Sequence, residues 1–395
     1  MQPHAPIGTQ INRRTFLGLV GSGLAYGVLP AREQLVTERE EFFRQGIIPR
    51  FEIELTPKDL QSLRQEPRKY VPATLKVGKE TVFKVGVHLK GAAGSFRGVD
   101  DKPALTVNLD KYVAGQHYHG LDKFHLNNSV QDGTYLMELL CAELFHAAGV
   151  PVSFCSHALV TLQGRKRGFF VLKEGYDKGF LQRTFRNTKG NLYDGGFLQD
   201  LDAPLQQLAG TEGPKDRADL KAVVQACALR NHAERLDRLE QLIDLEKFLT
   251  LAALEVITWH WDGYAMKRNN YRIYHEPTRG KLYFIAHGMD QMFGDPNGPI
   301  QPGFEGMVAR AVVQTGVGKQ RYRECFAQLM RTHFKPDRFA ERIDELENRV
   351  RPVLTEVDAN AGKEYPQHLK NLRHLIRVRA EEISKQMKRD WQKTL

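Results

Sequence analysis

The first half of the chain has alternating apolar and polar positions, which are typical of half-buried β-strands. The pattern runs through RFEIELT, TVFKVGVHLKG, PALTVNLD, DKFHLNN, SHALVTLQG and KRGFFVLKEG, between residues 50 and 174. A short helix is expected at PKDLQSL, after Thr56, and a longer one from about Gly133 to Ala148. The longer helix should end before Gly149 and Pro151, which do not continue a helix. These patterns predict a β-rich unit built around one main helix.

The second half has mainly helical periodicity. Residues 179–250 are predicted as loops and helices, and the strongest apolar helix is expected near residues 244–259. The segment YRIYHEPTRGKLYFIAH alternates as a hairpin with its turn at residues 277–280, and the chain beyond Gly294 is predicted to be helical to its end. We therefore predict an α+β fold of two lobes, a β-rich lobe at 32–178 and a helical lobe at 179–395, joined by a hinge from Glu174 to Lys178.

The N-terminus has a different character from both lobes. The segment INRRTFLGLVGSGLAYGVLPA places Arg13 and Arg14 before Phe16 and Leu17, and a weakly apolar, glycine-rich stretch then continues to about Pro30. This segment is too short and too rich in glycine to anchor as a spanning helix, and it resembles a twin-arginine export signal. Residues 1–31 are therefore expected to be a signal peptide, which would place the protein in the periplasm or outside the cell with no stable membrane span after signal removal.

Composition adds two constraints on partners and redox chemistry. The chain carries 57 Lys and Arg against 47 Asp and Glu, a formal charge of +10, with both signs mixed along the sequence. A generally basic solvated surface explains this mixture better than a nucleic-acid groove, so no nucleic-acid partner is expected. The four cysteines share no close metal-ligand spacing. Buried thiols are therefore expected rather than a zinc site, and one disulfide is compatible with the sequence.

Short oxygen-bearing side chains cluster at the ends of the apolar segments in the second half. Asp262 follows the apolar helix directly, Asn269 and Asn270 precede the first hairpin strand, and Asp290 follows the second in HGMDQMFG. Carboxylate and amide oxygens are the ligands that Mg²⁺ prefers. The order of elements, with strands, a helix, a hinge, helices and then these residues, is also that of a protein kinase. In that order Asp262 would serve the acceptor hydroxyl.

Eight ordered blocks resemble those of a known family. They are VGVHLKGAAGSF, KPALTVNLDKY, HGLDKFHLNNSVQD, CAELFHAAGVP, FFVLKEGYDKGFL, GNLYDGG, HWDGYAMKRNNYRIY and HGMDQMFG. Over residues 48–330 the chain is similar to the spore-coat CotH kinase family. The resemblance implies a bilobal protein-kinase-like fold that binds ATP with Mg²⁺ or Mn²⁺ and phosphorylates serine or threonine of a secreted or envelope protein. Asp262 is then the expected catalytic residue, and Asn270 and Asp290 the expected metal ligands.

The groups that would bind the nucleotide are less sharply defined by the sequence. Lys90, Lys102 and Lys123 are the three candidates for the phosphate-binding lysine, and the hinge residue Glu174 is expected beside the nucleotide. On the helix at 133–148, a spacing of 100° per residue places Glu143 within the apolar arc. A carboxylate in that arc needs a cation, so Glu143 is predicted to pair with the lysine.

Two other functions compete with a kinase. The first is a catalytically inactive kinase-fold protein that acts as an envelope or coat interaction module. The second is a metal-dependent hydrolase that uses Asp262 and Asp290. The presence of Asp262, Asn270 and Asp290 together favours the kinase, whereas export away from the cytoplasmic ATP pool favours the interaction module.

Overall fold

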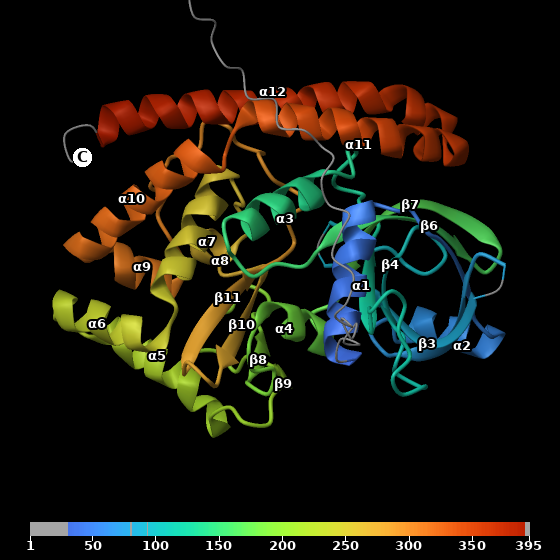
Figure 1. Ribbon diagram of the computed structural model, residues 1–395, viewed down its shortest axis with the longest axis horizontal. Coiled ribbons are helices and arrows are strands. Elements are labelled where there is room, and N and C mark those ends of the chain that lie inside the picture. Colours follow the sequence, from blue (N-terminus) through green and yellow to red (C-terminus); the bar gives the residue numbers. More distant parts are fainter. Residues whose placement is uncertain (1–30, 80, 93, 392–395) are drawn as a thin grey trace, which may run out of the picture.

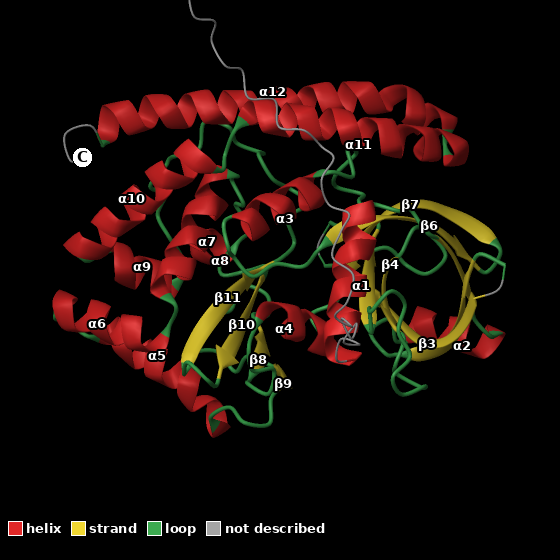
Figure 2. Ribbon diagram, in the orientation of Figure 1, coloured by secondary structure: helices red, strands yellow, loops and turns green. Residues whose placement is uncertain are grey.

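The computed structural model describes residues 31–391 except 80 and 93, and it has an α+β architecture. A closed seven-stranded β-barrel forms one part of the molecule, and helices around a four-stranded sheet form the other (Figure 1). Figure 2 shows the barrel strands on one side of the molecule and most of the helices, together with the smaller sheet, on the other. The α+β prediction is confirmed. The expected signal peptide lies outside the described residues, apart from its last position.

The strands are β1 (Arg50–Glu54), β2 (Val71–Val77), β3 (Thr81–Lys90), β4 (Ala104–Asn108), β5 (Lys123–Asn127), β6 (Cys155–Leu162), β7 (Arg165–Glu174), β8 (Leu192–Asp194), β9 (Gln207–Ala209), β10 (Tyr271–Glu276) and β11 (Lys281–Ala286). The helices are α1 (Ala31–Gln45), α2 (Pro57–Gln65), α3 (Met137–Ala147), α4 (Lys178–Thr184), α5 (Ala218–Ala228), α6 (His232–Leu242), α7 (Leu245–Ile257), α8 (Tyr264–Lys267), α9 (Met307–Val313), α10 (Gly316–Thr332), α11 (Pro336–Val357) and α12 (Ala359–Asp390).

The barrel has the strand order β1-β2-β3-β4-β5-β7-β6 and closes through a parallel pairing of β1 with β6. Successive residues of a strand point to opposite faces, so the alternation seen in the sequence sorts side chains between the barrel interior and its outside. The pairing registers align Leu89, Leu105, Leu126 and Leu172 as one layer of the interior. Lys90 follows Leu89, and Lys173 follows Leu172, so both lysine side chains point to the outside of the barrel.

The long helix of the β-rich part begins later than the sequence pattern predicted. Asp132 is buried and accepts hydrogen bonds from the backbone N–H groups of Thr134 at 2.8 Å and Met137 at 3.0 Å. Tyr135 has a positive φ of 56°, so the chain still turns there. The helix α3 therefore starts at Met137 rather than Gly133.

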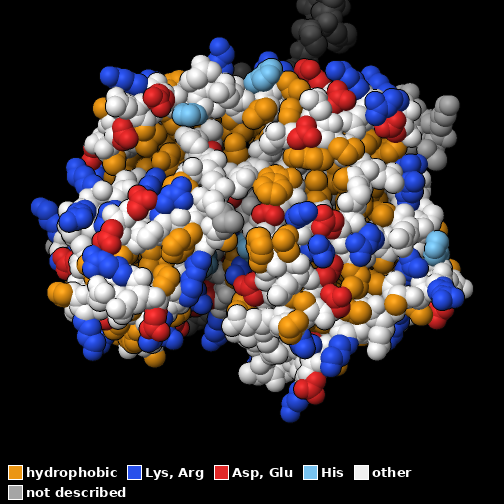
Figure 3. Space-filling view, turned by 180° about the vertical axis from the view of Figure 1, so that it is seen from behind, with side chains coloured by type: hydrophobic (Ala, Val, Ile, Leu, Met, Phe, Trp, Pro, Cys, Tyr) orange, Lys and Arg blue, Asp and Glu red, His pale blue; other side chains and the backbone are white. Residues whose placement is uncertain are grey.

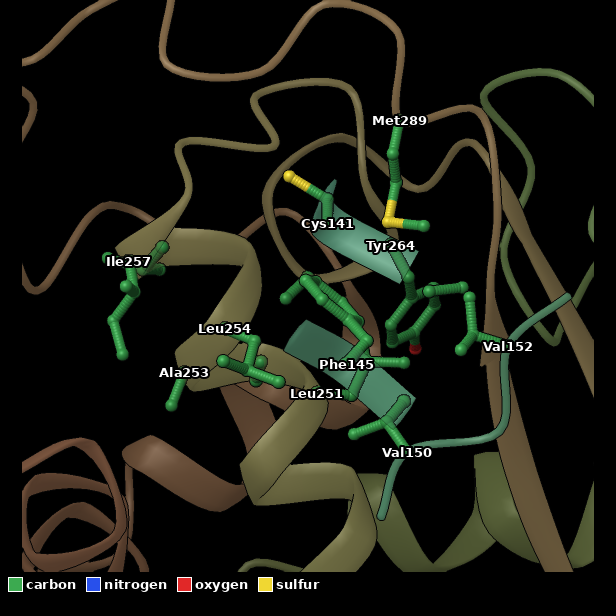
Figure 4. Close-up of a cluster of buried hydrophobic side chains, with 14 of the residues drawn as sticks. Cys141, Phe145, Val150, Val152, Leu251, Ala253, Leu254, Ile257, Tyr264 and Met289 are labelled. Carbon is green, nitrogen blue, oxygen red and sulfur yellow. The ribbon is translucent and has the colours of Figure 1, made fainter. Parts of the chain in front are cut away.

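The helical part is organised around α7, whose side chains are buried over almost its whole length. Figure 4 shows Leu251, Leu254 and Ile257 of α7 in one cluster with Phe145 of α3 and with Tyr264 and Met289. The sheet has the order β11-β10-β8-β9. The hairpin β10–β11 was predicted, but β2, β8 and β9 were not. The latter two have three residues each, too few to establish an alternating pattern.

The hairpin of α11 and α12 runs along both parts of the molecule (Figure 1). Arg50 of the barrel forms two hydrogen bonds to Glu356 of α11, at 2.8 and 2.6 Å. Tyr365 of α12 donates a hydrogen bond of 2.8 Å to the carbonyl oxygen of Thr134, just before α3. The C-terminal helices thus connect the barrel with the helical part.

The surface carries charges of both signs, and the cysteines form no disulfide among the described residues. On the face drawn in Figure 3, Lys and Arg side chains lie among Asp and Glu side chains over the whole surface. All four cysteines, Cys141, Cys155, Cys227 and Cys325, are free thiols. Among the described helices, none combines the length and apolar character needed to cross a bilayer.

Candidate active site

A cavity of about 530 Å³ lies between the barrel and the helical part. Its barrel side comprises Lys90, the loop that follows β3, Asn127, Glu138 and Lys173. Its other side comprises Asp194 and the residues after β8, Trp261, Asp262, Asn269, Asn270 and the segment His287 to Gln291. The three residues predicted to carry catalysis and metal binding, Asp262, Asn270 and Asp290, therefore line one cavity.

The carboxylate of Asp262 is held by two amides. Asn269 donates to both carboxylate oxygens, each at 3.0 Å, and Asn270 donates to Oδ2 at 2.8 Å and to the backbone carbonyl at 3.1 Å. Burial raises the pKa of Asp262, and the hydrogen bonds from the two amides oppose that rise. Because the amide nitrogens are used on Asp262, the amide oxygens remain to accept from another group or to bind a cation.

A buried glutamate fixes the backbone that follows Asp262. Glu255 of α7 is fully buried and accepts backbone hydrogen bonds from Tyr264 at 3.0 Å and Ala265 at 2.8 Å. Burial raises the pKa of Glu255 to about 8, although these backbone N–H groups favour the carboxylate. A Cβ atom on Gly263 would lie 2.6 Å from the carboxyl carbon of Glu255, so only glycine allows this close approach.

Asp290 is placed by the end of β11 and by His260. The Nε2 of His260 lies 3.1 Å from the carbonyl oxygen of Gly288, and burial lowers the pKa of His260 to about 4. The neutral imidazole therefore donates to that carbonyl at neutral pH. Met289 packs into the core below (Figure 4). Asp290 follows directly and reaches the cavity, where burial first and the carboxylate of Glu138 second raise its pKa.

Asn270 and Gly288 bring the two segments into contact. Asn270 has a φ of 48° and Gly288 a φ of 64°, values that asparagine and glycine tolerate better than other residues. A Cβ atom on Gly288 would lie 2.3 Å from Oδ1 of Asn270. The amide oxygen of Asn270 is therefore directed toward the segment that carries Asp290.

The barrel side of the cavity contains a continuous chain of polar contacts. Lys173 pairs with Glu138, Asn127 donates to the other oxygen of Glu138, and Lys90 donates to the amide oxygen of Asn127. Burial disfavours both charges of the Lys173–Glu138 pair, but their mutual attraction outweighs it, so the pKa of Lys173 is raised and that of Glu138 lowered. Burial lowers the pKa of Lys90 to about 8.

The structure corrects the prediction that Glu143 is the buried carboxylate of α3. The side chain of Glu143 is 45% exposed and pairs with Arg342 at 2.6 Å, whereas that of Glu138 is 1% exposed. The angular argument failed because α3 is also buried outside the apolar arc, at Cys141, Ala142 and Phe145. On such a helix an apolar arc does not identify the face that meets the cavity.

Three further candidates lie outside this cavity. The side chain of Glu174 is fully buried and pairs with Arg39 at 3.0 Å and with Arg183 at 2.6 Å. Lys102 lies 3.1 Å from the hydroxyl of Tyr135 and stacks on its ring, and burial lowers its pKa to about 8. Lys123 is half-buried at the start of β5. Of the predicted lysines, only Lys90 lines the cavity.

The sequence interpretation missed Lys173, Glu138, Asn127, His260 and Glu255. One signal was present for Lys173, because a lysine after the apolar run GFFVL is rarely buried without a partner. A second was the spacing His260-Trp261-Asp262, which matches the histidine and aspartate of a kinase catalytic loop. The lysine partners of Glu138 and Asn127 are distant in sequence, since Lys173 lies 35 positions from Glu138 and Lys90 lies 37 positions from Asn127.

The oxygen atoms near Asp290 suit a hard divalent cation. Burial raises the pKa of Asp290 more than the nearby charge of Lys90 lowers it. The amide oxygen of Asn270 lies beside Gly288, two residues before Asp290. Such a set, with phosphate oxygens and water, meets the needs of Mg²⁺. Within the described part of the chain, no three His, Cys, Asp or Glu residues form a metal cluster. A cation here would therefore depend on amide and ligand oxygens.

Comparisons with known proteins identify the family of the chain. The model of a family described as CotH kinase protein matches residues 87–383. Two curated relatives come from Rhizopus delemar. Invasin CotH2 is 24% identical over 263 residues, which is 58% of this chain and 44% of that protein, and Invasin CotH3 is 27% identical over 190 residues, 43% of this chain and 31% of that protein. The match spans less than half of either relative. Because the family model covers most of the chain, the protein belongs to the CotH kinase protein family.

Proposed function

We propose that the protein is a kinase that transfers a phosphoryl group from ATP to serine or threonine of another protein, with Mg²⁺ or Mn²⁺ as cofactor. One observation carries the proposal. A single cavity combines two lysines on the barrel side with an aspartate, two asparagines and a second aspartate on the helical side. Phosphoryl transfer requires positive charge around the phosphates and a positioned acceptor hydroxyl, and little covalent chemistry from the protein.

On the barrel side, Lys173 and Lys90 would face the phosphates of ATP. Glu138 orients Lys173, and Asn127 orients Lys90 through its amide oxygen. A buried lysine that keeps its charge through a carboxylate is a fixed positive group, and it needs no rearrangement when negative charge develops on the phosphates. We propose that the Lys173–Glu138 pair corresponds to the lysine–glutamate pair of protein kinases, and that the barrel and the helical part correspond to the two kinase lobes.

On the helical side, Asp262 would orient the acceptor hydroxyl and accept its proton. Its two amide contacts set the direction of the carboxylate, and Glu255 holds the backbone that follows. Asn270 and Asp290 would hold the divalent cation, which when bound neutralises phosphate charge. The raised pKa of Asp262 suits it to accept a proton. A more basic carboxylate takes the proton more readily than a fully solvated one.

We also propose that the protein is exported and acts on an envelope or secreted protein. The twin-arginine motif supports export, and the curated relatives carry the name invasin. That name also favours the second candidate, a kinase-fold interaction module without transfer activity. The two candidates differ in whether the cavity binds ATP productively.

The first test measures thermal unfolding with nucleotide. We expect ATP to raise the melting temperature only when Mg²⁺ or Mn²⁺ is present, because Asn270 and Asp290 would hold the cation that neutralises the phosphate charge. A ligand at ~100 times its Kd adds about 2.7 kcal/mol to the free energy of unfolding. The control is ATP with a chelator, and transfer of labelled phosphate to a serine-rich peptide completes the test. No shift at millimolar nucleotide would exclude the kinase and leave the interaction module.

The pKa of Lys90 predicts how nucleotide affinity depends on pH. Lys90 is protonated below about pH 8 and neutral above it, so its attraction for phosphate is present at pH 7 and lost as the pH rises through 8. We expect the Kd for Mg-ATP to increase between pH 7 and pH 9, measured by calorimetry. In Lys90→Arg the charge persists at pH 9, so the same titration should be flatter. An equal pH dependence in both proteins would remove Lys90 from the phosphate site.

A further inference from the structure

A second cavity, of about 410 Å³, lies along the hairpin β10–β11 and is separate from the candidate active site. Its walls come from the segment after α3, from the end of α4 and the residues after it, from the hairpin turn, and from the first turn of α7. Phe185 and Tyr283 supply aromatic surface, and Val150 and Val152 supply aliphatic surface. The cavity can therefore hold an organic group as well as a charge.

Positive charge is in excess in this cavity. Arg186, Lys247 and Arg279 line it, and within the described residues none of them forms an ion pair with a carboxylate. Lys247 donates to the carbonyl oxygen of Gly149 at 2.7 Å, and Arg279 contacts the hydroxyl of Tyr283 at 3.5 Å. These three cations are therefore available to an anionic ligand.

One carboxylate opposes this charge. Glu276 lines the cavity, but its oxygens accept hydrogen bonds from the backbone N–H groups of Asn187 at 3.1 Å and Arg279 at 2.8 Å. The carboxylate is therefore bound to the hairpin turn and to the segment after α4. The excess of positive charge remains after Glu276 is counted against one of the three cations.

Two buried donors complete the wall. The side chain of Arg183 is 5% exposed; its Nε and Nη2 contact Glu174, and Nη2 also donates to the carbonyl oxygen of Val152 at 2.9 Å. Its guanidinium also lies over the ring of Phe154, 3.8 Å from the centroid. The hydroxyl oxygen of Thr184 is buried and lacks a hydrogen-bond partner among the described residues. A buried hydroxyl without a partner is costly, and a ligand oxygen would satisfy it.

We propose that this cavity binds the phosphate of a phosphorylated serine or threonine in a peptide. Guanidinium groups match the oxygens of a phosphate monoester, and clusters of arginine are a known mode of phosphopeptide recognition. The choice of this ligand rests on the proposed function, because a phosphorylated acceptor is the product of that reaction. The cavity would retain an acceptor that already carries one phosphate while another of its residues is modified.

The position of the cavity allows both sites to be occupied together. Asn270 directly precedes β10 and Asp290 follows β11, whereas Arg279 lies in the turn at the other end of the hairpin. Each strand has six residues, so the turn is about 20 Å from the catalytic end at ~3.3 Å per residue. A peptide of moderate length can span this distance.

The test uses the full-length Asp262→Asn variant, so that no transfer alters the probe. We expect a fluorescein-labelled peptide with one phosphoserine to bind at least about 10-fold more tightly than the same peptide with serine or glutamate, by fluorescence anisotropy. Arg186→Ala with Arg279→Ala should weaken binding of the phosphopeptide about 10-fold or more. The matched control removes two exposed charges of α12, in Arg377→Ala with Lys388→Ala, and should change it less than about 2-fold.

Competition identifies the cavity that is used. Inorganic phosphate should displace the phosphopeptide, and saturating Mg²⁺ with a non-hydrolysable ATP analogue should not. Displacement by the analogue, equal binding of the serine peptide, or equal loss in the two double variants would overturn the assignment. Because binding is measured without nucleotide, a failure of ATP to bind would overturn the kinase proposal alone, and transfer without phosphopeptide binding would overturn this inference alone.

Discussion

Asp262→Asn is expected to lower phosphoryl transfer at least about 10²-fold and to leave Mg-ATP binding nearly unchanged. A positioned base contributes in the transition state, so its loss affects transfer more than binding. Asparagine has the shape of aspartate, and its amide oxygen can still accept from Asn269 or Asn270. The loop, which Glu255 holds from below, should therefore stay in place. Transfer to a serine-rich peptide and calorimetric titration with Mg-ATP measure the two effects.

Two controls separate catalysis from general damage. Asp290→Ala should weaken both nucleotide binding and transfer, because a metal ligand contributes to the ground state as well. Asp237→Asn changes an exposed carboxylate on α6 and should alter neither. If Asp262→Asn loses nucleotide binding while Asp290→Ala retains it, the two roles are reversed. Full transfer activity in both variants would place the reaction elsewhere in the molecule.

Arg379→Met is expected to lower the free energy of unfolding by about 3–5 kcal/mol, one of the larger effects of a single substitution. Arg379 of α12 is fully buried and donates to the carbonyl oxygens of Val256 at 2.6 Å, Ile257 at 3.1 Å and Pro296 at 3.2 Å, and also to that of Gly298. Burial lowers its pKa to about 10. Methionine fills similar space but leaves these buried acceptors without donors, which is the costly outcome.

The matched control lies two residues earlier on the same helix. Arg377 is exposed, so Arg377→Met should change the free energy of unfolding by no more than about 0.5 kcal/mol. The loss in free energy of unfolding for Arg379→Lys should lie between those of Arg379→Met and Arg377→Met. An ammonium group keeps the charge but cannot donate to all four carbonyl oxygens. Urea unfolding followed by circular dichroism measures all three. Similar midpoints for Arg379→Met and Arg377→Met would mean that the guanidinium contacts contribute little.

Much of the candidate site could be predicted because its residues are local to predicted elements. Asp262 follows a strongly apolar helix, and Asn270 and Asp290 flank a hairpin whose alternation is clear. A helix end and the open end of a hairpin are positions where polar side chains meet a cavity. The choice of Asp262, Asn270 and Asp290 used the order of these elements together with the resemblance to the CotH kinase family, and the three residues line one cavity.

The charged groups of the barrel side could not be predicted in the same way. Lys173, Asn127 and Lys90 come from β7, β5 and β3, which the closed barrel brings to one cavity, and Glu138 was passed over in favour of Glu143. A local pattern reveals neither which lysine lines the cavity nor which glutamate of α3 is buried, because α3 is apolar on nearly every side. The burial of Arg379 is a similar case, since its partners lie more than 80 positions away.

The sequence by itself determined the α+β class, the helix that precedes Asp262, the hairpin that separates Asn270 from Asp290, and the family to which the blocks belong. These features follow from periodicity and from residues close together in the chain. The tertiary structure decided which lysine meets which glutamate, that Glu174 pairs with arginines away from the cavity, and that a second basic cavity exists. Burial and ion pairing depend on which distant elements pack together, and the free energy of a buried charge is set by neighbours that no local pattern specifies.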